Sequence, residues 1–311
     1  MTKVSIIIPT YHSSSLVETL RGLQSQSAWH AIEEILVVGA QELGAWGEWP
    51  KVRYISVEDR PTPARNRNIG AREGESEWLC FTDADCVPQP NWVATFMAYA
   101  ERWQVPALTG GVIIPLDVPY WALCDNLLAF SDYRATALST PTFVPYGASL
   151  NFCIRRDIFF QLGGFSESFN TAAGEDWELS ERLRADGNRI LFVPEAAVEH
   201  RPRRDRFSDA WQHMRQYGIA VAQRKHIHGM DWRWRIARRL LRVPGLLEVY
   251  GVFRVLARFP GHMYQIARSY PRHLHTVLGV CLLDAALSFG MVQGLRMSPS
   301  PRSAMQTRSC R

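Results

Sequence analysis

The sequence contains few cysteines, and they do not form the patterns that bind zinc or staple small folds. Among 311 residues there are 6 cysteines, with no Cys-x-x-Cys pair and no short disulfide spacing. This distribution argues against a zinc site and favours a reducing compartment. The chain also lacks a secretory leader pattern, because Met1-Thr2-Lys3 runs directly into a short apolar stretch that ends at Pro9. We therefore expect no leader.

Acidic residues are scarce in the last third of the chain. Residues 201–311 contain 5 Asp and Glu against 20 Lys and Arg, whereas residues 1–200 contain 25 against 15. The two parts thus carry net charges of −10 and +15, which give +5 in total. A change of sign of this size predicts a change of binding partner near residue 200.

Short apolar runs alternate with helical patterns over the first 85 residues. Buried strands are predicted at residues 4–8, 34–38, 52–57 and 78–81, with helices at 16–23 and 63–74. This order predicts an α/β fold with a mostly parallel sheet and flanking helices. Such sheets bind ligands beyond the carboxyl ends of their strands, where Thr10, Gly39 and Asp83 fall.

Two carboxylates follow the predicted strand at residues 78–81. Alternate residues of an extended chain point the same way, so Asp83 and Asp85 can face one point. Hard carboxylate oxygens suit Mg²⁺ or Mn²⁺ holding a diphosphate. A turn with two solvated aspartates would give the same pattern, so its meaning depends on the rest of the chain.

Several stretches, taken in order, resemble the family-2 inverting glycosyltransferases, whose nucleotide-sugar-binding fold is called GT-A. The resemblance covers about residues 3–225 and is carried by residues 5–11, 63–66, 81–88, 147–150, 163–165, 174–179 and 194–200. It implies a metal-dependent transfer of a sugar from a nucleotide-diphosphate donor to a hydroxyl of a glycan or lipid-linked acceptor. Such a reaction would serve cell-surface polysaccharide or glycolipid synthesis.

The resemblance also implies roles for single residues. The general base would be Asp176, with Glu175 as second choice, and the metal ligands would be Asp85, Asp83 and His200. The nucleotide sugar would contact Pro9, Thr10, Tyr11, Arg65, Asp83 and Ala84, and the acceptor would contact Gly147, Ser149 and Trp177. Alternatives remain open for several of these: Arg65 could form a salt bridge to Asp59 or Glu73, and Trp177 could fill the core.

One stretch departs from the family pattern. After the second strand the family usually has an aspartate that recognises the nucleobase, whereas this chain has Val38-Gly39-Ala40-Gln41-Glu42. Gln41 or Glu42 could take that role. A UDP-sugar is the favoured donor, and a GDP-sugar is possible.

The basic last third suggests a membrane partner. A helical projection of residues 232–242 places Arg235, Arg238, Arg239 and Arg242 on one face and Trp232, Ile236 and Leu240 on another. Residues 276–295 are apolar enough to span a membrane, but Asp284 near their middle favours a helix lying in the interface, or a re-entrant helix, over a full span. For residues 232–242, a helix packed on the domain with solvated arginines is the alternative.

We expect three parts: a GT-A domain at residues 1–225, a membrane-associating helical region at 226–296, and a disordered tail at 297–311. The protein would lie on the cytoplasmic face of the cell membrane, as a peripheral or monotopic protein without a nucleic-acid partner. Two other functions are possible. A sugar-1-phosphate nucleotidyltransferase would need a glycine-rich basic loop after the first strand, which residues 10–15 lack. A non-enzymatic basic membrane or nucleic-acid binder would leave the acidic first 200 residues without a role.

Overall fold

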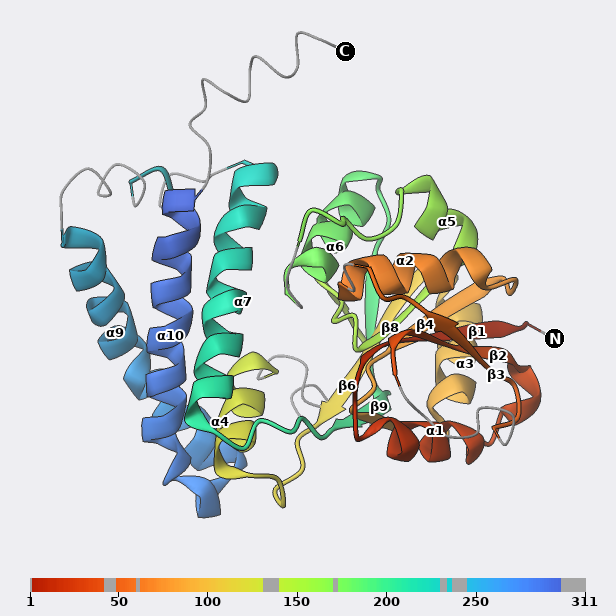
Figure 1. Cartoon of the computed structure of the whole chain (residues 1–311), viewed down its shortest axis with the longest axis horizontal. Helices are drawn as coiled ribbons and strands as arrows, with labels where there is room; N and C mark the ends of the chain where they lie inside the picture. The colour runs from red at the N-terminus through yellow and green to blue at the C-terminus, as the bar shows by residue number, and fades with distance from the viewer. Residues whose placement is uncertain are drawn as a thin grey trace, which may run out of the picture. The chain divides into compact units, whose positions relative to one another are not determined.

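The chain forms two compact units, which are Met1–Asp205 and Arg206–Arg311. A computed structural model describes residues 2–41, 49–59, 62–130, 140–169, 173–229, 234–236 and 245–297 (Figure 1). The boundary between the units lies earlier than the predicted one at residue 225. The reason is that α7 (Phe207–Ile227) packs along α10 (Thr276–Met297). A Cβ added to Gly218 of α7 would lie 2.0 Å from the Leu287 carbonyl oxygen of α10, so this close approach requires glycine.

A nine-stranded sheet forms the centre of the first unit, in the order β3-β2-β1-β4-β8-β6-β9-β5, with β7 paired to β9. The strands are β1 (Val4–Tyr11), β2 (Ile32–Ala40), β3 (Val52–Ser56), β4 (Trp78–Thr82), β5 (Cys86–Pro88), β6 (Ala107–Ile113), β7 (Thr142–Val144), β8 (Asn151–Arg155) and β9 (Ile190–His200). The sheet is parallel from β3 to β4, while β8 runs antiparallel to both β4 and β6. The predicted α/β fold is confirmed.

Helices cover both faces of this sheet (Figure 1). One core joins the sheet to α1 (Leu16–Gln24) and α3 (Trp92–Trp103). A second core, on the other face, includes side chains of α2 (Pro63–Glu73), α5 (Arg156–Gln161) and α6 (Glu175–Ala185). Ile6 and Ile8 of β1 enter the first core and Ile7 enters the second, which is why residues 6–8 form an unbroken apolar run.

Asn151 holds the middle of the sheet together through its buried side chain. Its Oδ1 accepts a hydrogen bond from Trp92 Nε1 at 2.7 Å, and its Nδ2 donates to the carbonyl oxygens of Gly111 at 2.9 Å and Ala196 at 2.8 Å. The register between β6 and β9 shifts between Gly110 and Val112. The asparagine therefore bridges the irregular stretch and fixes the half of β9 that ends at the site described below.

β8 begins at Asn151, directly after a turn. Residues 149 and 150 lie in a turn, and the Asn151 amide donates to the Ala148 carbonyl oxygen at 2.9 Å. The Ser149 amide instead donates to the Asp176 carboxylate at 3.1 Å. This contact keeps Ser149 out of the ladder, so β8 starts at Asn151.

In the second unit, α7 and α10 pack together with α9 (Leu246–Ser269), and the short 3-10 turn Pro271–His273 follows α9. Asp284 of α10 is completely buried, with its carboxylate 2.5 Å from Arg254, 3.1 Å from Arg258 and 3.1 Å from His262. These partners, all from α9, offset the cost of burying the charge.

By length and composition, the α10 helix Thr276–Met297 is the candidate membrane span among the described residues, with a mean hydropathy of 1.6. Of its most apolar window, 56% is buried within the protein, as in the core helix of a soluble protein. Most of the basic helix predicted at residues 232–242, including Arg238, Arg239 and Arg242, and the predicted tail beyond Met297 lie outside the described residues.

Candidate active site

The turn after β4 carries the predicted acidic pair. The Cys86 amide donates to the Asp83 carbonyl oxygen at 3.1 Å, which closes the turn that presents Asp83 and Asp85. Ser13 Oγ donates to the carbonyl oxygen of Ala84 at 3.3 Å and so ties this turn to the loop after β1. Both loops follow parallel neighbouring strands and meet at the carboxyl edge of the sheet, as predicted.

His200 faces Asp85 across the sheet because β5 and β9 pair antiparallel, with Cys86 opposite His200. Its Nε2 lies 3.6 Å from Asp85 Oδ2, and its Nδ1 lies 2.6 Å from Asn126 Oδ1. Asn126 Nδ2 donates to the His200 carbonyl oxygen at 3.1 Å, so Oδ1 is the acceptor and the proton sits on Nδ1. Nε2 is thereby directed to the Asp85 side.

Asn126 was not predicted as a site residue. It lies on α4 (Tyr120–Ala129), which a second contact anchors nearby: Arg204 Nη1 lies 3.0 Å from the completely buried Asp125 carboxylate. Adjacent helix residues thus fix the histidine and the segment after it. The sequence signal for Asn126 is the pair Asp125-Asn126 within an otherwise apolar helical segment. Buried carboxylates and amides need specific hydrogen-bond partners, so such a pair indicates a polar contact inside the protein.

The residues around Asp85 fit a divalent cation. Burial by itself would raise the pKa of Asp85, but His200 and Arg204 outweigh it and hold the pKa at about 2. Ligand atoms of Asp85, Cys86 and His200 all lie within 4.8 Å of one another. Burial and the neighbouring carboxylates raise the pKa of Cys86 well above its usual value, so its thiol stays protonated. A carboxylate and a neutral imidazole nitrogen are ligands that suit Mn²⁺ and, for the carboxylate, Mg²⁺.

Arg67 connects the acidic turn to α6. Its side chain is only 3% exposed; Nη2 lies 2.6 Å from Asp83 Oδ1, and Nη1 lies 2.8 Å from Glu175 Oε1. Burial alone would lower the pKa of Arg67, but Asp83, Glu175 and Asp176 act against it and raise the pKa. One buried guanidinium therefore lies among three carboxylates from two segments of the chain.

The prediction named Arg65 rather than Arg67. The side chain of Arg65 donates to the Asp59 carbonyl oxygen near the protein surface, so the alternative partner Asp59 is engaged through its backbone. Ala64, Arg67, Asn68 and Ala71 are buried at the spacing i, i+3, i+4, i+7, which is the inward face of a helix. Applying that spacing to residues 63–74 would have found Arg67.

Glu175 and Asp176 lie in the first turn of α6, after Gly174 with φ 94°. Glu175 is buried against Arg67, and its pKa is raised by burial first and by Asp176 second. Asp176 is half-buried; its Oδ2 accepts from the Ser149 amide at 3.1 Å and its Oδ1 from the Trp177 amide at 2.8 Å. Burial raises the pKa of Asp176 in spite of these bonds. Asp176 is thus the more accessible of the two carboxylates.

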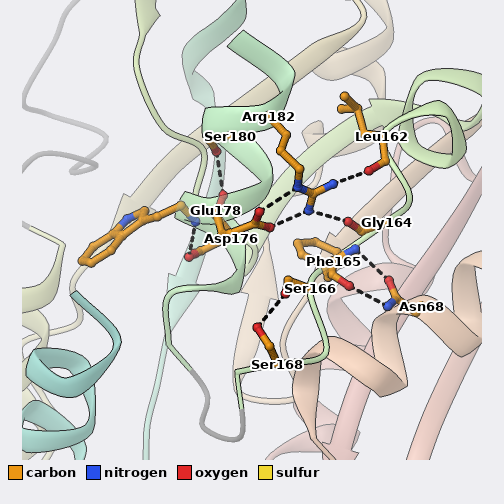
Figure 2. A network of polar contacts seen from close by, with 11 residues as sticks. Asn68, Leu162, Gly164, Phe165, Ser166, Ser168, Asp176, Glu178, Ser180 and Arg182 are labelled. Atoms are coloured by element: carbon orange, nitrogen blue, oxygen red, sulfur yellow. Dashed lines mark hydrogen bonds and ion pairs between the residues drawn. The ribbon is translucent and has the colours of Figure 1, made fainter. Parts of the chain in front are cut away.

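Figure 2 shows how α6 is held in place. Arg182 meets the Glu178 carboxylate at 2.5 Å and donates to the carbonyl oxygens of Leu162 and Gly164. Asn68 of α2 donates to the Phe165 carbonyl oxygen and accepts from the Phe165 amide, at 2.8 and 2.9 Å. The turn after α5 therefore joins α2 to α6, and it fixes the start of α6 relative to Arg67.

Gln41 has a structural partner in the loop after β1. Its Oε1 accepts from Thr10 Oγ1 at 2.8 Å and from the Ser13 amide at 2.7 Å, and its Nε2 donates to the Ser13 carbonyl oxygen at 3.0 Å. The suggested nucleobase role for Gln41 would require these bonds to be exchanged. At the end of β1, Pro9 and Thr10 are buried, whereas Tyr11 is 68% exposed. Glu42 lies outside the described residues.

The predicted acceptor residues surround the start of α6. The Gly147 amide donates to Ser180 Oγ at 3.1 Å, and Ser149 contacts Asp176 as described. The ring of Trp177 is half-buried, with its centroid 6.4 Å from that of Tyr146. Tyr146 was not predicted, and its position one residue before Gly147 is the only sequence signal for it.

Comparisons with known proteins agree with this arrangement. The chain is 28% identical over 230 residues to the O-antigen biosynthesis protein RfbC of Myxococcus xanthus, covering 67% of this chain and 18% of that protein. It is 26% identical to N-acetylgalactosaminyltransferase 7 of Drosophila melanogaster, covering 64% and 39%, and 24% identical to the pre-mycofactocin glycosyltransferase of Mycobacterium tuberculosis, covering 63% and 42%. The chain therefore spans less than half the length of these relatives.

Solved structures share the fold. Mannosyltransferase PcManGT from Pyrobaculum calidifontis, in complex with GDP-Man and Mn²⁺, matches with a TM-score of 0.57 at 17% identity, covering 93% of this chain and 87% of that one. GalNAc-T7 with UDP, GalNAc and Mn²⁺ matches with a TM-score of 0.54 at 20% identity, covering 71% and 48%. The profile "Glycosyl transferase family 2" matches residues 5–163, and "Glycosyltransferase like family 2" matches residues 120–231. The chain belongs to glycosyltransferase family 2, with the GT-A fold.

Proposed function

We propose that this protein transfers a sugar from a nucleotide-diphosphate donor to an acceptor hydroxyl, with inversion at the anomeric carbon and with a divalent metal ion. The observation that carries the proposal is the chain of contacts Asp83–Arg67–Glu175, which places the acidic turn beside the start of α6. These contacts support a single site for the proposed metal ligands and the proposed base.

Asp85 and His200 are the proposed metal ligands. Asp85 is ionised at neutral pH because its pKa lies at about 2, and His200 turns Nε2 toward Asp85 because Asn126 holds Nδ1. A bound cation would take the place of a proton on Nε2. A bound divalent cation would neutralise the negative charge that develops on the departing nucleoside diphosphate. Asp83, held by Arg67, is proposed to contact the donor or the metal, and Pro9, Thr10, Tyr11, Ala84 and Arg65 remain the proposed nucleotide-sugar contacts.

Asp176 is the proposed general base. Its half-buried carboxylate is oriented by the amides of Ser149 and Trp177, and its raised pKa brings its basicity closer to neutral pH. A single base that removes the acceptor proton, opposite the leaving group, permits direct displacement and therefore inversion. Gly147, Ser149 and Trp177 would line the acceptor side.

The acceptor is proposed to be a glycan or a lipid-linked glycan at the cytoplasmic membrane surface, in polysaccharide or glycolipid synthesis. The similarity to an O-antigen biosynthesis protein and the basic, apolar second unit support this. The donor class is open between UDP- and GDP-sugars, because fold relatives were solved with each.

The test combines a donor screen with two variants. UDP- and GDP-sugars are incubated with Mn²⁺ or Mg²⁺, and the anomeric configuration of the product is read by NMR. Asp176→Asn should lower the transfer rate by about 10²–10⁴-fold while donor binding persists. Asp157→Asn, an equal change at an exposed carboxylate, should leave the rate unchanged. Transfer by Asp176→Asn within threefold of the parent would refute the assigned base, and a retained configuration would refute inversion.

Metal binding is tested without reference to activity. Asp85→Asn should abolish saturable Mn²⁺ binding measured by calorimetry, with an unchanged circular dichroism spectrum. Mn²⁺ affinity equal to that of the parent would refute this ligand assignment.

A further inference from the structure

The outer side of α9 is an apolar stripe. Its exposed apolar residues are Leu246, Val249, Val252, Phe253, Leu256, Met263 and Tyr264. At 3.6 residues per turn these positions fall within about 120° of the helix circumference. Phe253 and Leu256 are 67% and 66% exposed, which is unusual for side chains of this size. The stripe is therefore a continuous surface rather than scattered apolar residues.

The basic residues in the middle of α9 lie on its opposite side. Arg254, Arg258 and His262 occupy the face that turns to α10, where all three contact the Asp284 carboxylate. One buried carboxylate thus holds the charged ends of two arginines on this side of the helix, with Arg254 largely covered and Arg258 45% exposed. This arrangement explains how a helix with central arginines keeps its outer side apolar.

α10 extends the same kind of surface. Leu278, Leu282 and Phe289 are exposed and fall within about 40° of one another on the helix. A groove of about 340 Å³ lies between the two helices, and its lining includes Val252, Leu256 and Phe289. We name the stripe on α9 together with these three α10 residues the α9–α10 face.

The charge around this face identifies its partner. Arg268 lies at the edge of the stripe near the end of α9, and Arg272 is exposed just beyond it. The second unit, residues 206–311, has 17 Lys and Arg and 4 Asp and Glu, which give a net charge of +13. An apolar centre with a cationic surround complements the hydrocarbon and the anionic headgroups of a lipid surface. Two copies of this unit would repel each other, and a nucleic acid would meet an apolar centre instead of cations.

We propose that the α9–α10 face docks the protein onto an anionic lipid bilayer. This inference deepens the membrane association proposed above, and it assigns the contact to α9 and α10 rather than to the predicted helix at residues 232–242. Docking would bury the stripe in the headgroup region and place Arg268 and Arg272 among lipid phosphates.

The experiment measures binding of the full chain to vesicles of phosphatidylcholine, with and without phosphatidylglycerol, by co-sedimentation at two salt concentrations. The double variant Phe253→Glu/Leu256→Glu should bind the anionic vesicles on the order of tenfold or more weakly, because it loses two bulky apolar contacts and gains two repelled charges. Ile227→Glu makes a similar change at an exposed apolar residue of α7 and should bind within about twofold of the parent. Added salt should weaken the parent's binding.

Three outcomes would overturn the proposal: vesicle binding that the double variant retains, equal binding to purely zwitterionic vesicles, or a lipid-free dimer, seen by ultracentrifugation, that the double variant dissociates. The last would make a second copy the partner. Hydrolysis of the donor sugar is followed in parallel. Lost vesicle binding with intact hydrolysis supports docking, whereas a parent that binds vesicles but acts on no donor refutes the proposed enzyme and leaves docking intact.

Discussion

Replacing Arg67 by methionine tests the contact that joins the two halves of the candidate site. The substitution keeps an unbranched side chain of similar reach but removes the charge that Asp83 and Glu175 share. It leaves three carboxylates, those of Asp83, Glu175 and Asp176, close together without their cation. The protein must then either bear their repulsion or take up protons.

The expected loss of stability follows from burial. Removing one partner of a buried ion pair costs about 3–5 kcal/mol, because the other charge is left unpaired. Glu175 is buried, whereas Asp83 is 29% exposed and is screened by water, so the lower end applies. We expect Arg67→Met to lower the free energy of unfolding by about 3 kcal/mol at pH 8. At pH 5.5 Glu175 takes up a proton more readily, and the loss should shrink toward about 1–2 kcal/mol.

The assay is urea denaturation at both pH values, followed by circular dichroism and fluorescence. Arg65→Met is the matched control, because it makes the same change on the same helix at a partly exposed position; its cost should stay below about 1 kcal/mol. The reasoning is wrong if Arg67→Met costs no more than Arg65→Met, or if its cost is the same at both pH values.

Three further predictions concern single contacts. Because the pKa of Glu175 is raised, the folded state keeps a proton that the unfolded chain loses above about pH 4.3, so the free energy of unfolding falls as the pH rises from there. Glu175→Gln should make the free energy of unfolding less dependent on pH in this range. A pH profile equal to that of the parent would contradict this prediction. Asn126→Ala removes the oxygen that accepts a hydrogen bond from His200 Nδ1, and it should weaken Mn²⁺ binding, measured by calorimetry, about 10–100-fold. An unchanged affinity would show that Mn²⁺ binding does not depend on this hydrogen bond. Trp92→Phe breaks the 2.7 Å bond to Asn151 and should cost about 1–3 kcal/mol in urea denaturation; a neutral effect would mean that the buried Asn151 oxygen finds another donor.

The sequence by itself determined the parallel strands β1 to β4, their order in the chain and the acidic edge. Residues 6–8 and 78–81 are apolar without interruption because these strands are buried on both faces, and Asp83 and Asp85 follow the second of these strands. The pair Glu175-Asp176 was also readable, since carboxylates and a glycine before them are typical of a helix start. All of these signals are local, and their meaning does not depend on distant residues.

Only the tertiary structure decided which of these groups meet. Arg67 and Glu175 are 108 residues apart in the chain, and their contact depends on how α2 and α6 pack on the same face of the sheet. Asn126 and His200 are 74 residues apart and meet because β9 pairs with β5 beside α4. In the second unit, only the structure shows that Arg254 and Arg258 of α9 both contact the buried Asp284. The spacing of apolar residues in the sequence indicates which side of a helix or strand is buried. The residues that this side contacts depend on packing and strand register between segments that are far apart in the sequence.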